Sequence, residues 1–194
     1  MVERLEALRR SDMGRLQSLL PAPTAAVSAR LVEPLRVVSL RYLPGSERAI
    51  EKTLAAVGLS RFAQAGRFEG TEPMLLWRSP SEMLFISSSD RAADDLLRAL
   101  PVDDDPLACA LDQSAGSCVI ELQGEGVDAV LQRLLDASAI PQQPGQGTRA
   151  RLADIAVGVW RLEAQRVGLL FDRSHDTYVA QWLAYAVQGA VQDS

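Results

Sequence analysis

Acid–base or nucleophilic chemistry in this chain would depend on a single histidine, His175. It follows Ser174, which we expect to cap a helix, and the positive end of a helix dipole disfavours a cationic imidazole. No G-x-S-x-G nucleophile motif accompanies it. The sequence therefore predicts a surface position for His175 and no catalytic residue, with a functional His175 as the weaker alternative.

Metal-ligating residue types are equally sparse. Cys109 and Cys118 fall on two predicted strands that we expect to be neighbours. Without C-x-x-C spacing, we interpret them as reduced core residues rather than a disulfide or a zinc pair. The acidic run 103–105 precedes Pro106 in a predicted turn and lacks the alternating ligands of a calcium loop. We predict no metal site on this chain.

Two glycine-containing segments are candidates for cofactor binding. Residues 124–126 (GEG) follow a predicted strand and open a predicted helix, but Ala129 stands where a G-x-G-x-x-G motif has its third glycine. Some variants of that motif tolerate alanine there, so dinucleotide binding is the weaker alternative to a tight turn. Residues 145–148 (GQGT) lack the lysine and the strand–loop–helix context of a phosphate-binding loop. We predict no cofactor site.

Composition narrows the class of protein. The chain has 194 residues, 47% of them hydrophobic, and a net charge of −5. No basic stripe is present, which argues against nucleic-acid binding. No apolar run approaches the roughly 20 residues that span a bilayer. The first 25 residues carry charges throughout and lack a signal-peptide core. The expectation is a cytoplasmic protein that binds neither membrane nor nucleic acid.

An internal repeat organises the chain. Residues 75–100 and 158–186 share a Trp-Arg pair, at Trp77 and Trp160, followed by Leu-Phe pairs ending at Phe85 and Phe171. The spacing from tryptophan to phenylalanine is eight residues in one copy and eleven in the other, as hairpins with turns of different length would give. The repeat predicts that Trp77 and Trp160 occupy equivalent positions.

Each half reads as strand, helix, strand, strand, helix, which predicts an α+β fold with helices on one side of mainly antiparallel sheets. The expected domain is residues 34–190, made of two half-repeats, 34–100 and 107–190. A further strand at 107–112 is expected to join them.

Residues 1–33 are expected to form an N-terminal arm. Apolar residues recur in it, but Gly14 and the prolines from Pro21 onward make an independent helix marginal. Two interpretations remain open: an amphipathic arm ordered by packing, or a partner-binding arm. The candidate partner interface is Leu5, Leu8, Leu16, Leu19 and Leu20.

Several short blocks, in order, resemble one protein family. They are 110–122 (ALDQSAGSCVIEL), 147–154 (GTRARLAD), 159–161 (VWR), and 171–174 (FDRS) with Trp182-Leu183. Together they resemble the gamma subunit of heterotetrameric sarcosine oxidase over roughly residues 30–188. The Asp112-x-Ser114 element is shared more widely with the folate-binding aminomethyltransferase (T-protein) fold, which the resemblance therefore implies.

The resemblance implies a role within a complex. Such a complex oxidatively demethylates sarcosine, using FAD, FMN and NAD, and passes the one-carbon unit to tetrahydrofolate. Those cofactors belong to its larger subunits and a zinc site belongs to the small delta subunit, so the implied partners are alpha, beta and delta subunits. The implied role of this chain is non-catalytic, and related complexes act on other N-methyl amino acids.

The alternative is a free-standing folate-binding or aminomethyltransferase-related protein. Aminomethyltransferases are about twice as long and carry a further C-terminal barrel domain. They also hold the pterin with an acidic residue, for which Glu82 and Asp112 are the candidates at predicted strand ends.

Overall fold

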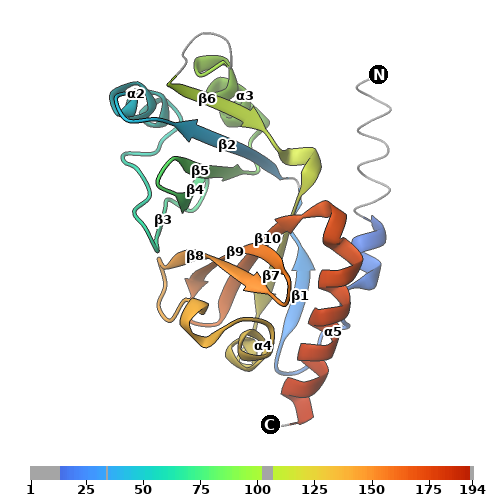
Figure 1. Ribbon diagram of the computed structural model, residues 1–194. Coiled ribbons are helices and arrows are strands. Elements are labelled where there is room, and N and C mark those ends of the chain that lie inside the picture. Colours follow the sequence, from blue (N-terminus) through green and yellow to red (C-terminus); the bar gives the residue numbers. More distant parts are fainter. Residues whose placement is uncertain (1–13, 34, 102–106, 193–194) are drawn as a thin grey trace.

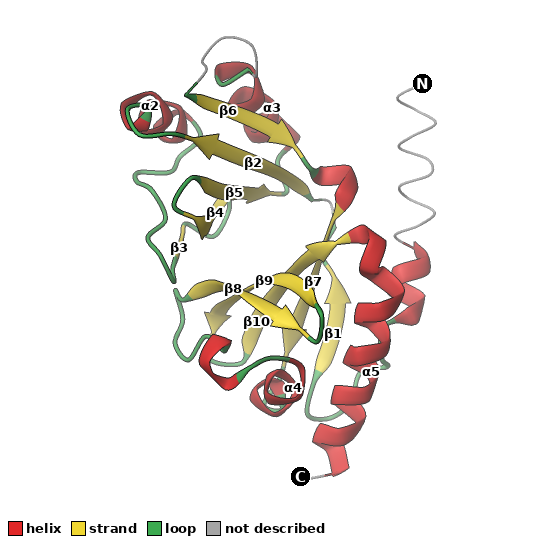
Figure 2. Ribbon diagram, viewed as in Figure 1, coloured by secondary structure: helices red, strands yellow, loops and turns green. Residues whose placement is uncertain are grey.

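The computed structural model describes residues 14–33, 35–101 and 107–192. Within them, two five-stranded antiparallel sheets face each other and carry helices on their outer sides (Figures 1 and 2). The predicted α+β class is therefore confirmed at the level of two antiparallel sheets with helices.

The first sheet has the strand order β3-β4-β5-β2-β6. In chain order its half of the molecule contains β2 (Arg36–Tyr42), α2 (Glu47–Ala56), β3 (Phe68–Glu69), β4 (Met74–Ser79), β5 (Glu82–Ser87), α3 (Asp90–Ala99) and β6 (Ala108–Asp112).

The second sheet has the strand order β1-β7-β10-β9-β8. Its elements are β1 (Ser28–Leu31), β7 (Ser117–Gln123), α4 (Val127–Leu134), β8 (Gly147–Leu152), β9 (Ile155–Glu163), β10 (Arg166–Asp172) and α5 (Asp176–Gln192), with 3-10 turns η1 (Ser114–Gly116), η2 (Ala137–Ala139) and η3 (Arg173–His175).

Three apolar clusters define the layers. One lies between the first sheet and helices α2 and α3, and includes Leu96. A second lies between the second sheet and α4, α5 and residues 14–20, and includes Leu183. The third fills the space between the sheets and includes Trp160. Because side chains alternate along a strand, successive residues of the central strands face different clusters, and β2 and β7 are buried almost throughout.

The residue-by-residue repeat expected from the sequence is not confirmed. The hairpins β4–β5 and β9–β10 each have a two-residue loop and one bulge, at Arg78 and Leu162. Aligned on these turns, Trp77 corresponds to Arg161, and Leu76 corresponds to Trp160. Trp77 packs on the helix side while Trp160 packs between the sheets, because a shift of one residue reverses the face. The predicted equivalence of the two tryptophans is therefore wrong by one position.

The expected boundaries also change. Strand β1, inside the predicted arm 1–33, pairs with β7 at the edge of the second sheet. Leu16 and Leu20 are buried in the core of that half, 1% and 9% exposed. The described part of residues 1–33 therefore belongs to the domain. Likewise β6, expected in the half-repeat 107–190, pairs with β2 in the first sheet.

Candidate functional site

The two sheets are tied together along one edge. Arg67 bridges to Gln146, the Phe68 amide donates to the Gly145 carbonyl at 3.3 Å, and the Gly147 amide donates to Gly66 at 3.0 Å. The Gln146 Oε1 accepts from the amides of residues 142 and 143. Residues 145 and 146 thus lie in a connecting loop, as expected, whereas residues 147 and 148 begin strand β8, and the amides of Gly145, Gln146 and Gly147 bond within the protein.

A buried arginine anchors this loop through hydrogen bonds. Arg161, 3% exposed, donates from Nε to the Pro141 carbonyl at 2.6 Å and also to Ala164 and Asp128. These contacts satisfy a guanidinium that would otherwise be costly to bury. The arginine has a structural role, as an anchor of loop 140–147 on α4.

A pocket of about 180 Å³ lies between the sheets, where β4 approaches β8. Its walls are largely apolar and come from both sheets: Leu76, Leu84, Gly158 and Leu170. Its polar lining consists of Arg78, Thr148, Arg149, Asp172 and His175.

His175 is half-buried in the lining of this pocket, in η3, rather than on the open surface that the sequence predicts. Asp172 caps the 3-10 turn η3, in which Ser174 lies: the Asp172 Oδ1 accepts from the Ser174 amide at 2.8 Å and from the Ser174 hydroxyl at 2.7 Å. These hydrogen bonds hold the pKa of the Asp172 carboxyl below its usual value. Sequence reasoning missed Arg78, Arg149 and Gly158, since no motif joins them.

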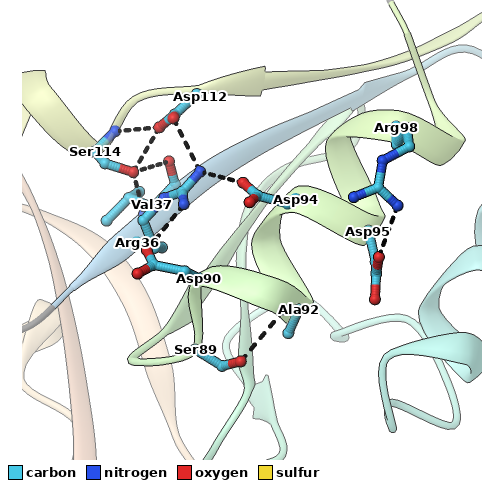
Figure 3. A network of polar contacts seen from close by, with 10 residues as sticks. All are labelled: Arg36, Val37, Ser89, Asp90, Ala92, Asp94, Asp95, Arg98, Asp112 and Ser114. Carbon is cyan, nitrogen blue, oxygen red and sulfur yellow. Dashed lines mark hydrogen bonds and ion pairs between the residues drawn. The ribbon is translucent and has the colours of Figure 1, made fainter. Parts of the chain in front are cut away.

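A second polar cluster fixes α3 on the first sheet (Figure 3). The Arg36 guanidinium contacts Asp90 and Asp94 at 3.0 Å and Asp112 at 3.2 Å. Burial alone would raise the pKa of Asp112, but hydrogen bonds from Ser114, at 2.5 and 2.8 Å, and the charge of Arg36 hold it below its usual value. Every member of the cluster is paired, which indicates a structural contact between β2, α3 and β6.

The second sheet contains a buried carboxylate. Glu121 on β7 is 5% exposed and binds Arg30 at 2.7 Å and Arg166 at 2.8 Å. Burial alone would raise the pKa of Glu121, but hydrogen bonds from Arg166 and Arg30 hold it below its usual value. The carboxylate therefore joins β1 to β10 across β7.

Helix α5 exposes an aromatic row. Tyr178, Trp182 and Tyr185 stack edge to face, with ring centroids 6.3 and 5.8 Å apart, and Tyr185 is 65% exposed. Residues 14–19 are helical and lie beside α5, where Arg15 donates to Thr177 at 2.9 Å. Of the predicted interface leucines, Leu19 is 39% exposed, Leu16 and Leu20 are buried within this chain, and Leu5 and Leu8 lie outside the described residues.

Comparison with solved structures identifies a relative of matching size. A chain of the heterotetrameric sarcosine oxidase from Corynebacterium sp. U-96, in complex with pyrrole 2-carboxylate, is 26% identical, with a TM-score of 0.76 over 92% of each chain. This chain is similar to a sarcosine oxidase subunit. The resemblance expected from the sequence is thereby confirmed.

A second solved structure shares the fold alone. The glycine cleavage system aminomethyltransferase T from Bartonella henselae is 12% identical, with a TM-score of 0.58 over 87% of this chain and 47% of that one. This chain spans about half the length of that protein. No family model and no curated protein matches the sequence.

The two acidic residues expected as pterin ligands in an aminomethyltransferase are both engaged here. Glu82 Oε1 accepts from Ser39 at 2.6 Å and from Arg78 at 3.2 Å. Asp112 is held by Ser114 and Arg36, as described above. Both oxygens of Asp112 are engaged, whereas the printed contacts of Glu82 all involve Oε1, so a pterin would compete with structural partners at Asp112 above all.

The remaining candidates are occupied by structural contacts. Gly124 has φ +133°, and a Cβ there would lie 2.2 Å from the Ala26 carbonyl oxygen, which also accepts from the Gly126 amide. The segment 124–126 is therefore the tight turn that was expected, packed against backbone. No disulfide joins Cys109 and Cys118, which lie in different sheets rather than on the neighbouring strands that were expected.

Within residues 14–33, 35–101 and 107–192, no group of three or more His, Cys, Asp or Glu side chains is arranged to hold a metal ion. In the same ranges no helix has both the length and the apolar character needed to cross a membrane.

Proposed function

We propose that this chain is the gamma-type, non-catalytic subunit of a heterotetrameric oxidase that demethylates sarcosine or a related N-methyl amino acid. The observation that carries this proposal is the similarity to a sarcosine oxidase chain over 92% of both chains at 26% identity. A match that leaves almost no residue of either chain unaligned favours an equivalent place in an assembly over a shared module.

The polar clusters support a structural role. Arg36 and Arg161 bind carboxylates or carbonyls, and Glu121 binds two guanidinium groups, all of which belong to the fold itself. Catalytic groups are commonly held with perturbed pKa values in a cleft, ready for a substrate. Here the lowered pKa of Asp112 comes from the Ser114 hydrogen bonds and the charge of Arg36, and the lowered pKa of Glu121 comes from its hydrogen bonds with Arg166 and Arg30. FAD, FMN, NAD, tetrahydrofolate and zinc would accordingly be bound by alpha, beta and delta subunits.

The contact with a larger subunit is proposed to involve the surface formed by α5 and the helix beside it. Leu19 and Tyr185 are exposed there.

The test is affinity purification of the tagged chain from its own cells under native conditions. Recovery of a flavin-containing complex that consumes oxygen when sarcosine or another N-methyl amino acid is added would support the proposal. Recovery of the chain alone, or a purified single chain that turns over sarcosine, would contradict it.

Two point variants examine the proposed contact. Leu19→Asp and Tyr185→Asp should leave the melting temperature of the isolated chain nearly unchanged, because both side chains are exposed, yet lower the yield of the complex. Lys52→Asp on α2, an exposed charge change on the opposite half, is the control and should assemble normally. Deleting residues 1–25 is a poor test, since it removes the buried Leu16 and Leu20.

Calorimetric titration of the isolated chain with tetrahydrofolate distinguishes the alternative function. Saturable micromolar binding would favour a folate-binding protein related to the aminomethyltransferases. The paired states of Glu82 and Asp112 predict no such binding.

A further inference from the structure

The pocket between the sheets exists because one cross-strand pair of the second sheet is smaller than its counterpart. With the hairpins aligned on their turns, Met74 opposite Ile86 in the first sheet corresponds to Gly158 opposite Leu170 in the second. Met74 is buried between the sheets, 3% exposed, whereas Gly158 lines the pocket. The second sheet therefore lacks a side chain at the place where the first sheet has a methionine.

The neighbouring pair shows that this loss of volume is specific to Gly158. Leu76 opposite Leu84 corresponds to Trp160 opposite Gly168. A Cβ on Gly168 would lie 2.3 Å from the Trp160 indole, so the large ring occupies the space that the glycine leaves. At Gly158 the nearest side-chain atoms are Leu76 Cδ2 and Leu170 Cβ, 3.1 and 3.7 Å from such a Cβ, so aliphatic side chains border this glycine and no aromatic ring covers it.

Basic groups from both sheets line this hollow. Arg149 comes from β8, Arg78 from β4 and His175 from η3. The Arg149 guanidinium makes no hydrogen bond or ion pair with any residue that the structure describes. Arg78 donates to Glu82 at 3.2 Å and keeps further donors, since a guanidinium has five N–H groups.

One carboxylate in the pocket lining would repel a bound anion. Asp172 also lines it, but its Oδ1 is held by the Ser174 amide and hydroxyl. Because Arg78 is also paired with Glu82, the positive charge that the lining offers a ligand comes mainly from Arg149, although the whole chain carries a charge of −5. A local positive pocket in an acidic protein favours anions over cations.

We infer that this pocket binds a small molecule with one carboxylate on a short apolar body. The carboxylate would pair with Arg149 and Arg78, because a guanidinium matches the two oxygens of a carboxylate. The apolar body would lie against Leu76, Gly158 and Leu170. A volume of about 180 Å³ is below the roughly 300–1,000 Å³ of drug-sized sites, which limits the ligand to on the order of ten heavy atoms. This inference does not depend on the proposed subunit role.

The inference is tested on the full chain by titration with isovalerate and with benzoate, followed by calorimetry and by amide chemical shifts. Benzamide is the neutral analogue of benzoate, and inorganic phosphate is the anion without an apolar body. We expect at least one carboxylate to saturate the pocket, with shifts confined to β4, β8, β9 and β10. Benzamide and phosphate should bind at least about tenfold more weakly, since charge-assisted hydrogen bonds and apolar contact are each lost.

Three variants locate the binding. Arg149→Gln should weaken the better carboxylate about tenfold or more. Gly158→Ala should abolish binding by filling the hollow, and the flexible end of Leu76 should let the fold accept the methyl group. Arg151→Gln is the matched control, with the same charge change two residues along β8 and outside the pocket lining, and it should bind normally.

The inference is overturned if neither carboxylate gives saturable binding. It is also overturned if Arg149→Gln and Arg151→Gln bind equally well, or if phosphate competes as strongly as benzoate. Unchanged melting temperatures of the variants would exclude unfolding as the cause of any loss.

Discussion

The two sheets share a strand order and a hairpin geometry, yet they fill equivalent positions with different chemistry. Where the first sheet has the half-buried Trp77 against its helices, the second has the buried Arg161. Where the first sheet pairs Leu76 with Leu84, the second pairs Trp160 with Gly168. The first sheet is stabilised there by apolar contact, and the second by hydrogen bonds to a loop. The same topology therefore accepts residues of different chemical type at equivalent positions, provided that the core volume stays filled and each buried polar group has a hydrogen-bond partner.

Among the substitutions that test this comparison, Arg161→Met should lower the free energy of unfolding the most. It leaves the Pro141 and Ala164 carbonyls without a donor and releases loop 140–147, so we expect a loss of about 3–5 kcal/mol in unfolding free energy. Urea denaturation measures the loss. Trp77→Met, at the corresponding place in the first sheet, should cost less because no polar group is left unpaired. Equal losses in the two halves would contradict the assignment of Arg161 as a polar anchor.

Gly168→Leu should come next. Its side chain would enter the space of the Trp160 indole, and overpacking of this kind costs about 1–3 kcal/mol. Adding Trp160→Leu recreates the Leu–Leu pair of the first sheet and should recover much of the loss. A double-mutant cycle by chemical denaturation measures the coupling between the two sites. Simple additivity of the two single effects would show that the pairs are not interchangeable.

Glu121→Gln addresses a further difference, because Ser39 stands at the corresponding place of the first sheet. We expect a loss of about 1–2 kcal/mol at neutral pH, since Arg30 and Arg166 are partly exposed and their charges are screened. The folded pKa of Glu121 is below its unfolded value of about 4.3. Its contribution is therefore complete above pH ~4.3 and is lost as the pH falls through the folded pKa.

Stability of wild type and Glu121→Gln measured against pH tests this sign. The difference between the two proteins should shrink on acidification below pH ~4.3 and stay constant above it. A difference that grows on acidification would mean that the Glu121 carboxyl is held protonated in the folded protein.

Arg36→Gln should have the smallest effect. Three carboxylates surround the guanidinium, but Asp90 is 81% exposed and Asp94 51%, so we expect a loss of about 0.5–1 kcal/mol. Because these charges reach solvent, the loss should shrink in high salt. Thermal melts of wild type and variant at low and high ionic strength measure it, with Arg98→Gln on the outer side of α3 as control. A loss independent of salt would point to packing rather than charge.

Much of the architecture could be predicted from local patterns. Alternating apolar residues and turn chemistry give the order strand, helix, strand, strand, helix for each half, to which the structure adds β3 and β8. The face of a strand could not be fixed in the same way, because both hairpins have a bulge at equivalent positions and Trp77 stands one residue closer to its turn than Trp160 does.

The pocket was not predictable from the sequence for a related reason. Arg78 and Arg149 are brought together only by the packing of one sheet on the other. Gly158 is recognised as the position of a missing side chain only when the two hairpins are aligned and Met74 is found at the corresponding place. The Arg36 cluster likewise joins residues from three elements. Edge strand β1 was missed since four residues, 28–31, carry too short a pattern.

The placement of β1 has a consequence for synthesis on the ribosome. This strand is made early, yet it pairs with β7, about ninety residues later along the chain. The first sheet, by contrast, is complete once β6 has emerged. During translation the N-terminal segment must therefore wait, with Leu16 and Val27 uncovered, while a finished half-domain forms behind it. The last step of folding is therefore the pairing of β1, one of the first segments to be made, with β7 in the half of the molecule that is made last.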